Sequence, residues 1–145
     1  MPTSAYPETR YAPVRAVNLA SKDERAQLSA AALRGFFRLV ERWSLRDADA
    51  KQLLGGVTNG PYYEMKKRPD ERVLDVDTLL RISYLLGIFE ALNSLHGQPL
   101  ADEWISLPNS NRIFGGGTPL GYLIQGGQPA MSTVRRLLDA RQAGL

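Results

Sequence analysis

The sequence contains no cysteine and a single histidine, His96. The absence of cysteine excludes disulfide bonds and thiolate metal sites. One histidine without thiolate or imidazole neighbours cannot supply the three or four protein ligands of a typical zinc site. His96 instead precedes Gly97 at the predicted end of a helix, where a cationic side chain is favourable. We therefore expect no bound metal.

Long apolar runs and strand patterns are also missing from the 145 residues. No stretch of about 18 apolar residues occurs, so no membrane-spanning helix and no membrane partner are predicted. Residues 1–13 lack the apolar segment of a signal peptide, and we expect a cytoplasmic protein. No segment alternates apolar and polar residues as a half-buried strand does, so the predicted fold is all-α.

No catalytic set is recognisable in the sequence. It has no cysteine nucleophile, and its one histidine has no candidate nucleophile nearby. Gly115, Gly116 and Gly117 precede a predicted helix start, but no lysine follows at the Walker position and no strand precedes them. A tight turn is the favoured interpretation of these glycines, and we expect neither enzymatic activity nor a cofactor.

Charge of one sign is concentrated in the first half of the chain. Residues 1–74 carry 13 Lys+Arg against 9 Asp+Glu, whereas residues 75–145 carry 5 against 6. A basic half favours contact with a polyanion, and a nearly neutral half favours contact with a protein. The sequence therefore indicates two different binding tasks.

The basic half has the outline of a helix-turn-helix after a predicted flexible arm at residues 1–20. Ser21 is a predicted N-cap for a first helix, and Ser44 is a predicted N-cap for a short helix over residues 45–54. Gly55-Gly56 then ends that helix, and a second short helix is predicted to end before Pro69. In such a unit the second helix presents its N-terminal residues to base edges, and a basic end can contact phosphates. The predicted base contacts are Thr58, Asn59, Tyr62 and Tyr63, and the predicted phosphate contacts are Lys66, Lys67 and Arg68.

A long apolar segment over residues 79–95 has almost no polar side. Asp75 or Asp77 is predicted to cap it, and Gly87 in its middle is expected to kink or split it. A helix that is apolar all round is buried on all sides. In a chain of this length, that property predicts either a central helix or a contact between two copies.

The last stretch, residues 104–145, combines an aromatic anchor, a glycine loop and a strong helix start. Thr118 is a predicted N-cap and Pro119 fits the first helical position. Gly126-Gly127 is predicted to break the chain before a final amphipathic helix over residues 130–142.

In two parts the sequence resembles the antitoxins of the Xre/MbcA/ParS type, which accompany RES-domain toxins. The first part comprises residues 53–57 (LLGGV), 62–67 (YYEMKK) and 79–88 (LLRISYLLGI). The second comprises residues 104–109 (WISLPN), 114–120 (FGGGTPL), 126–127 (GG) and 134–141 (VRRLLDAR). The resemblance covers roughly residues 28–145, and the second part is the more specific.

The resemblance implies an N-terminal Xre-like helix-turn-helix and dimerisation region at residues 21–97, and a toxin-binding domain at residues 98–145. It implies a non-enzymatic antitoxin that obstructs the active site of an NAD-degrading RES toxin. It also implies a homodimer that binds operator DNA and represses its own operon. The residues it assigns to toxin binding are Trp104, Asn109, Phe114, Gly116, Pro119, Arg135, Arg136, Arg141 and Leu145. A stand-alone helix-turn-helix transcription regulator, whose C-terminal domain dimerises or senses a ligand, is the alternative.

Overall fold

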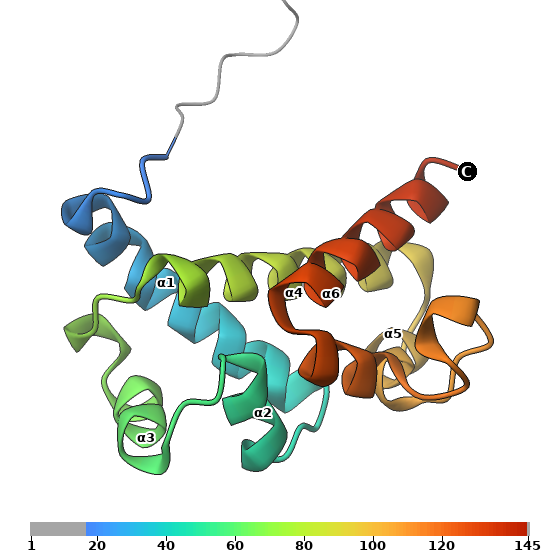
Figure 1. Ribbon diagram of the computed structural model, residues 1–145, viewed down its shortest axis with the longest axis horizontal. Helices are drawn as coiled ribbons and strands as arrows, with labels where there is room; N and C mark the ends of the chain where they lie inside the picture. The colour runs from blue at the N-terminus through green and yellow to red at the C-terminus, as the bar shows by residue number, and fades with distance from the viewer. Residues whose placement is uncertain (1–16, 145) are drawn as a thin grey trace, which may run out of the picture.

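The computed structural model describes residues 17–144, and every regular element in this range is helical (Figure 1). This arrangement confirms the predicted all-α fold. The predicted arm at residues 1–20 lies mostly outside the described residues. The three long helices are α1 (Lys22–Arg42), α4 (Val76–Leu95) and α6 (Pro119–Gln142). The shorter elements are α2 (Asp47–Leu53), α3 (Asn59–Lys67), η1 (Pro69–Glu71), α5 (Leu100–Glu103), η2 (Trp104–Ser106) and η3 (Arg112–Phe114).

Three of the predicted helix caps are confirmed by side-chain hydrogen bonds. The Ser21 hydroxyl accepts from the Glu24 amide at 3.4 Å, and the Asp75 carboxylate accepts from the Thr78 amide at 2.8 Å. Thr118 accepts from the Gly121 amide at 3.1 Å, with Pro119 at the first helical position. Each bond satisfies a first-turn amide that has no partner inside its helix.

The predicted cap at Ser44 is wrong. Ser44 has a φ of 52°, in the left-handed region, and α2 begins three residues later at Asp47. The chain reverses direction between α1 and α2 here, and the Leu45 amide bonds back to the Val40 carbonyl at 3.0 Å. Ser44 therefore lies in the turn between α1 and α2, and it does not cap α2 as the local pattern predicts.

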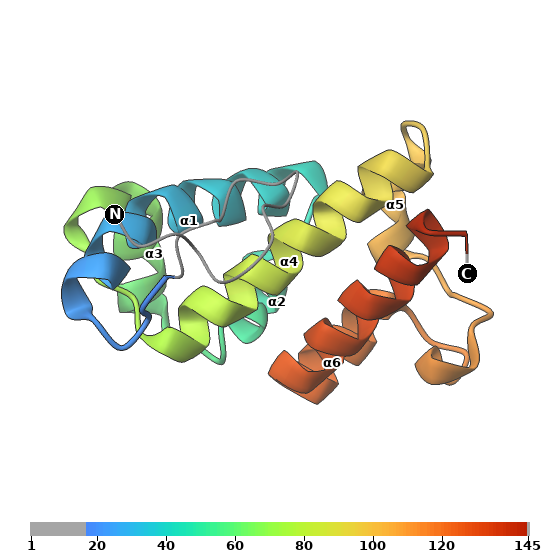
Figure 2. The same ribbon diagram turned by 90° about the horizontal axis from the view of Figure 1, so that it is seen from above.

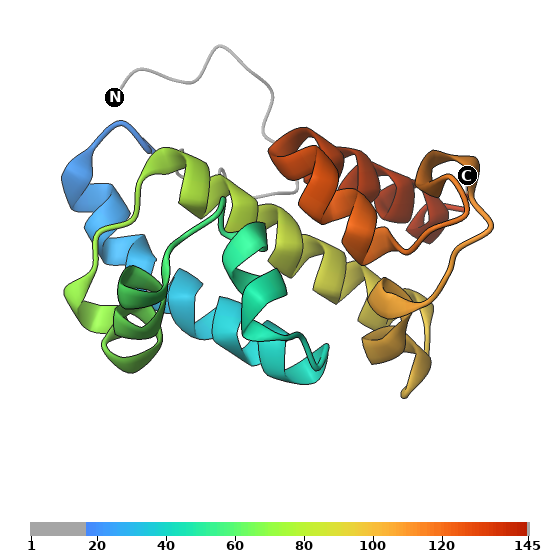
Figure 3. The same ribbon diagram turned by 60° about the horizontal axis from the view of Figure 1, so that its bottom comes forward.

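Helix α4 is the centre of the fold. It runs between α1 and α6, as Figures 2 and 3 show from two directions. Its buried residues include Leu79, Ile82, Leu85, Ile88 and Leu92. Much of the all-round apolar pattern is therefore buried within one chain, with α4 at the centre of the helices. Tyr84, Leu86 and Phe89 are only partly buried. Helix α4 is also continuous, so the expected kink or split at Gly87 is wrong.

The predicted break at Gly126-Gly127 occurs inside α6. Gly127 has a φ of 65°, which interrupts the helical backbone, and Pro129 follows in the second half. The second half buries Met131, Val134 and Leu138 against the rest of the molecule. No helix within residues 17–144 is both long and apolar enough to cross a membrane.

A single cluster of buried side chains joins the two predicted functional regions. It includes Leu33 and Trp43 from the first region, Leu85 from α4, and Trp104 and Met131 from the second. The predicted boundary near residue 97 separates two regions with different predicted functions, but both regions share one hydrophobic core.

Candidate functional site

The two candidate surfaces lie at opposite ends of the molecule. Helix α3 lies at the left of Figures 1 to 3, and the loop around η3 lies at the right. Each surface is built by short elements that are held against the three long helices. A partner on one end would leave the other end accessible.

The carboxylate of Asp47 holds α2 against α3. It accepts hydrogen bonds from the Tyr62 hydroxyl at 2.8 Å and the Tyr63 hydroxyl at 3.2 Å. The Lys66 ammonium lies 3.9 Å from the same carboxylate. The Tyr62 hydrogen bond is the largest cause that lowers the pKa of Asp47, against an opposing effect of burial. Burial is the largest cause that raises the pKa of Tyr62, and the hydrogen bond to Asp47 is the second. The negative charge of Asp47 raises the pKa of Tyr63.

Tyr62 does not face DNA, contrary to the prediction. Its side chain is fully buried, and its ring packs edge-on against Phe37 with centroids 5.5 Å apart. Position 62 falls on the face of α3 that packs on α1, together with the buried Met65. The other N-terminal side chains of α3 are exposed, namely Thr58, Asn59 and Tyr63.

Most of the predicted phosphate contacts are already paired within the chain. Arg68 lies 3.0 Å from Glu64 and 4.0 Å from Glu71, and Lys66 pairs with Asp47 as described. Lys67 is exposed and has no ion-pair partner within residues 17–144. A phosphate approaching α3 would therefore meet one unpaired cation among the predicted three.

The glycine loop between η3 and α6 has a defined shape. Gly115 and Gly116 adopt φ values of 57° and 83°, in the left-handed region that glycine occupies without a steric cost. The Asn109 amide donates to the Gly117 carbonyl at 3.1 Å, and the Asn109 side chain accepts from the Asn111 amide at 2.9 Å. Asn109 thus closes the loop from the other side.

Trp104 and Phe114 anchor this loop from inside the molecule. Both are 7% exposed, and their rings meet edge-on with centroids 6.0 Å apart. Phe114 also packs edge-on against Tyr122 at 5.4 Å, and Pro119 is buried. The resemblance groups Trp104, Phe114 and Pro119 with the toxin-binding residues, among which Gly116 and Pro119 are predicted to act through shape. Their burial gives them a supporting role.

The three arginines predicted on the last helix differ in their surroundings. Arg135 donates from Nε to both carboxylate oxygens of Asp139 at 3.1 Å. Arg136 and Arg141 are exposed and have no side-chain partner within the described part of the chain. Leu145, the last predicted contact, lies outside the described residues.

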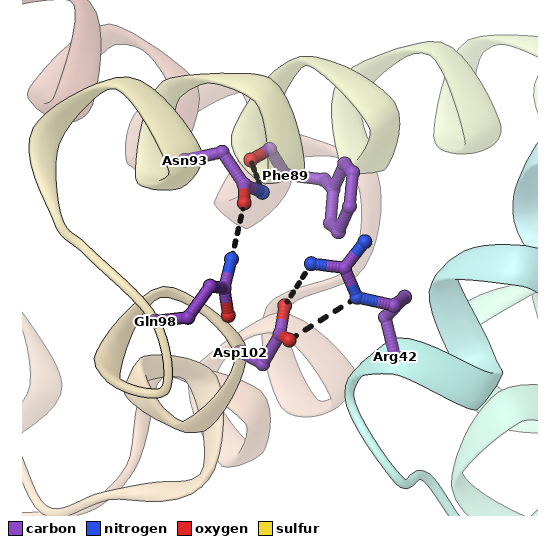
Figure 4. A network of polar contacts seen from close by, with 5 residues as sticks. All are labelled: Arg42, Phe89, Asn93, Gln98 and Asp102. Atoms are coloured by element: carbon purple, nitrogen blue, oxygen red, sulfur yellow. Dashed lines mark hydrogen bonds and ion pairs between the residues drawn. The ribbon is translucent and has the colours of Figure 1, made fainter.

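A polar network that the sequence did not indicate joins α1 to α5 (Figure 4). Arg42 donates to both oxygens of Asp102 at 3.1 and 3.2 Å, and its guanidinium lies 5.3 Å from the centroid of the Phe89 ring. Gln98 and Asn93, joined at 2.7 Å, extend the network to the end of α4. Arg42 and Asp102 are 60 residues apart in sequence, so no local pattern could have paired them.

Residues 17–144 contain no group of three or more histidine, cysteine, aspartate or glutamate side chains arranged to hold a metal ion. His96 stands as the C-cap of α4, at the predicted helix end.

The chain is 35% identical over 133 residues to the uncharacterized protein y4oB of Sinorhizobium fredii. The alignment covers 91% of this chain and 98% of that protein. No protein-family model matches the sequence. No solved structure matches the chain.

Proposed function

For this chain, which belongs to the same family as the uncharacterized protein y4oB of Sinorhizobium fredii, we propose that it is an antitoxin. The proposal rests on the resemblance of its sequence motifs to those of the Xre/MbcA/ParS-type antitoxins. The protein binds a RES-type toxin, obstructs the toxin's NAD-degrading site, and has no enzymatic activity of its own. It also binds operator DNA as a homodimer. Such partners place it in the cytoplasm.

The observation that best supports toxin binding is a pair of exposed arginines on the second half of α6 that have no side-chain partner within residues 17–144. Arg136 and Arg141 project from a helix whose other face is fixed in the core by Met131, Val134 and Leu138. A guanidinium group forms two parallel hydrogen bonds with a carboxylate, and a fixed helix reduces the entropy lost on binding. The end of α6 is therefore the segment proposed to enter the toxin's active site.

The antitoxin proposal is tested by mixing the purified protein with a purified RES-type toxin and measuring NAD loss. The double variant Arg136→Glu/Arg141→Glu should restore NAD consumption, because it places two anions where two cations meet the toxin. Arg38→Glu is the matched control, since Arg38 is an exposed arginine on α1 that has no ion-pair partner among the described residues. Inhibition that survives the double variant unchanged would remove the role of α6.

DNA binding rests on the α2–α3 turn and on the exposed Thr58, Asn59 and Lys67. In a gel shift with the upstream region, affinity should fall as salt rises, because binding releases counterions. Lys67→Glu should weaken binding to all sequences and reduce the salt slope by about 1. Arg112→Glu, at an exposed position in η3 at the opposite end of the molecule, should change little. Equal losses from both variants would indicate general charge attraction.

The alternative is a stand-alone transcription regulator, which the same α2–α3 geometry favours. It predicts operator binding without any effect on NAD loss by the toxin. The two assays above therefore separate the alternatives.

The homodimer is supported by an apolar groove between α1 and α4. The groove has a volume of about 570 Å³, and Leu28 and Val17 at its edge are 38% and 55% exposed. A second copy covering this groove would remove that apolar surface from water. Light scattering on the wild-type protein and on Leu28→Glu tests the proposal, which expects a dimer and a monomer, respectively.

A further inference from the structure

Gly87 stands at the middle of α4, where a side chain from α6 occupies the space a methyl group would need. A Cβ atom built at position 87 would lie 1.4 Å from Nη1, 2.3 Å from Cζ and 2.9 Å from Nε of Arg135. The guanidinium group therefore rests on the backbone of α4. Gly87 is also the single glycine of α4, so no other position on this helix offers the same gap.

Arg135 reaches this gap from the side of α4 that faces α6. Its Nε atom is fixed by the Asp139 carboxylate one helical turn further along α6. On the other side, Arg135 lines the groove between α1 and α4 together with Leu28 and Ala32 of α1. The side chain thus crosses α4 at the position that has no side chain of its own.

This crossing adds a directional contact in the middle of a mostly apolar helix pair. A second polar contact lies at one end of the pair, where the Gln128 amide of α6 donates to the Asp77 carboxylate of α4 at 2.8 Å. Met131, Val134 and Leu138 bury the second half of α6. The free energy of apolar burial depends on the area removed from water and has no preferred direction, so it does not by itself fix the position of α6 along α4. A one-turn slide along α4 would bring apolar side chains opposite one another again, because almost every face of α4 is apolar. After such a slide, however, the Arg135 side chain would have to cross α4 at a residue that carries a Cβ atom.

We propose that Gly87 and Arg135 are a matched pair that fixes the register of α6 on α4. Arg135 is then a positioning residue, and its predicted role as a direct toxin contact passes to Arg136 and Arg141. The consequence for toxin binding rests on the proposed function, whereas the register itself does not.

A double-mutant cycle of wild type, Gly87→Ala, Arg135→Ala and the double variant tests the pair by urea unfolding. Alanine is a better helix former than glycine, so Gly87→Ala should raise the midpoint in the Arg135→Ala background. In the presence of Arg135 the same change should raise the midpoint less or lower it, because the guanidinium group is displaced. Equal shifts in both backgrounds would overturn the proposal, since they would show that the two positions act independently.

Gly60→Ala is the matched control, because Gly60 lies in α3 and a Cβ there meets nothing within 4 Å. Its midpoint shift should be the same with and without Arg135. If Gly87→Ala fails to fold, a folded Gly87→Ala/Arg135→Ala variant supports the pair. Failure of both to fold overturns it.

Hydrogen exchange provides a readout of register that general stability would not reproduce. Amides of residues 130–142 should exchange faster in Gly87→Ala and in Arg135→Ala, while the amides of α1 remain protected. Arg135→Lys should not restore protection, because an ammonium group lacks the planar fork. Exchange that rises equally in α1 and α6 would contradict a role specific to α6.

Inhibition of the RES-type toxin should fall by the same factor in Gly87→Ala, Arg135→Ala and the double variant. If the wild-type protein inhibits no toxin, the antitoxin proposal fails. The urea midpoints and the hydrogen-exchange rates still test whether Gly87 and Arg135 fix the register of α6 on α4.

Discussion

Asp47 shows how one side chain can hold two helices together. It lies in the first turn of α2, and its carboxylate accepts hydrogen bonds from two tyrosine hydroxyls of α3. This contact buries Tyr62 and leaves Tyr63 at the surface with its hydroxyl occupied. Fewer side chains of α3 are therefore free to contact a partner than its sequence suggests.

The lowered pKa of Asp47 leads to a prediction about pH. A carboxylate whose pKa is lower in the folded protein stabilises it above the unfolded pKa, near 4, and loses this effect as pH falls through the folded value. Asp47→Asn should therefore reduce the free energy of unfolding at pH 7, and the difference from wild type should shrink below about pH 4. Urea unfolding at pH 7, 5 and 3 measures this difference.

Tyr62→Phe provides the matching test, because the Tyr62 hydrogen bond is the largest cause of the shift. In that background the pH-dependent part of the Asp47→Asn effect should be smaller. A difference that remains constant down to pH 3 would show that Asp47 does not act through its charge.

At the scale of elements, the glycine loop and α6 form a unit with a fixed entry angle. Two glycines in left-handed geometry, the Thr118 cap and Pro119 set the path into the helix. The packed aromatic rings of Trp104, Phe114 and Tyr122 support the loop on its buried side. These residues maintain the shape of the path into α6.

Gly116→Ala should destabilise the protein by about 1–2 kcal/mol, because alanine pays for the left-handed backbone that glycine adopts freely. Gly97→Ala is the control, since Gly97 has no left-handed φ and nothing lies within 4 Å of a Cβ there. Chemical denaturation should give a clear loss for Gly116→Ala and a small change for Gly97→Ala. Equal effects would mean that the φ of Gly116 is not the cause.

At the scale of the whole molecule, one core and one polar network connect the two predicted functional regions. Trp43 and Trp104, one from each region, belong to the same buried cluster. The Arg42–Asp102 contact adds a second connection at the surface between α1 and α5 (Figure 4). The molecule should therefore unfold as one cooperative unit.

The two tryptophans allow this expectation to be measured. In Trp104→Phe, fluorescence reports on Trp43, and in Trp43→Phe it reports on Trp104. Within each variant, the fluorescence and circular dichroism transitions should coincide. A fluorescence transition that precedes the loss of helix in either variant would show that the two regions unfold separately.

The sequence by itself determined the helical class, the caps at Ser21 and Thr118, and the break at Gly126-Gly127. For the cap of α4 it offered Asp75 or Asp77, and the structure shows Asp75. These features depend on residues within a few positions of one another, so local chemistry suffices. Position 87 was recognised as unusual, but the local consequence expected of a helical glycine, a kink, did not occur.

Only the tertiary structure decided that Gly87 receives Arg135, that Tyr62 is buried, and that Arg42 meets Asp102. Each of these pairings joins residues brought together by the packing of different helices. The apolar pattern of α4 allowed either a central helix or a contact between copies, because burial has no preferred partner. The packing of α1 and α6 on both sides of α4 makes it a central helix, and the groove between α1 and α4 is the surface proposed for a second copy.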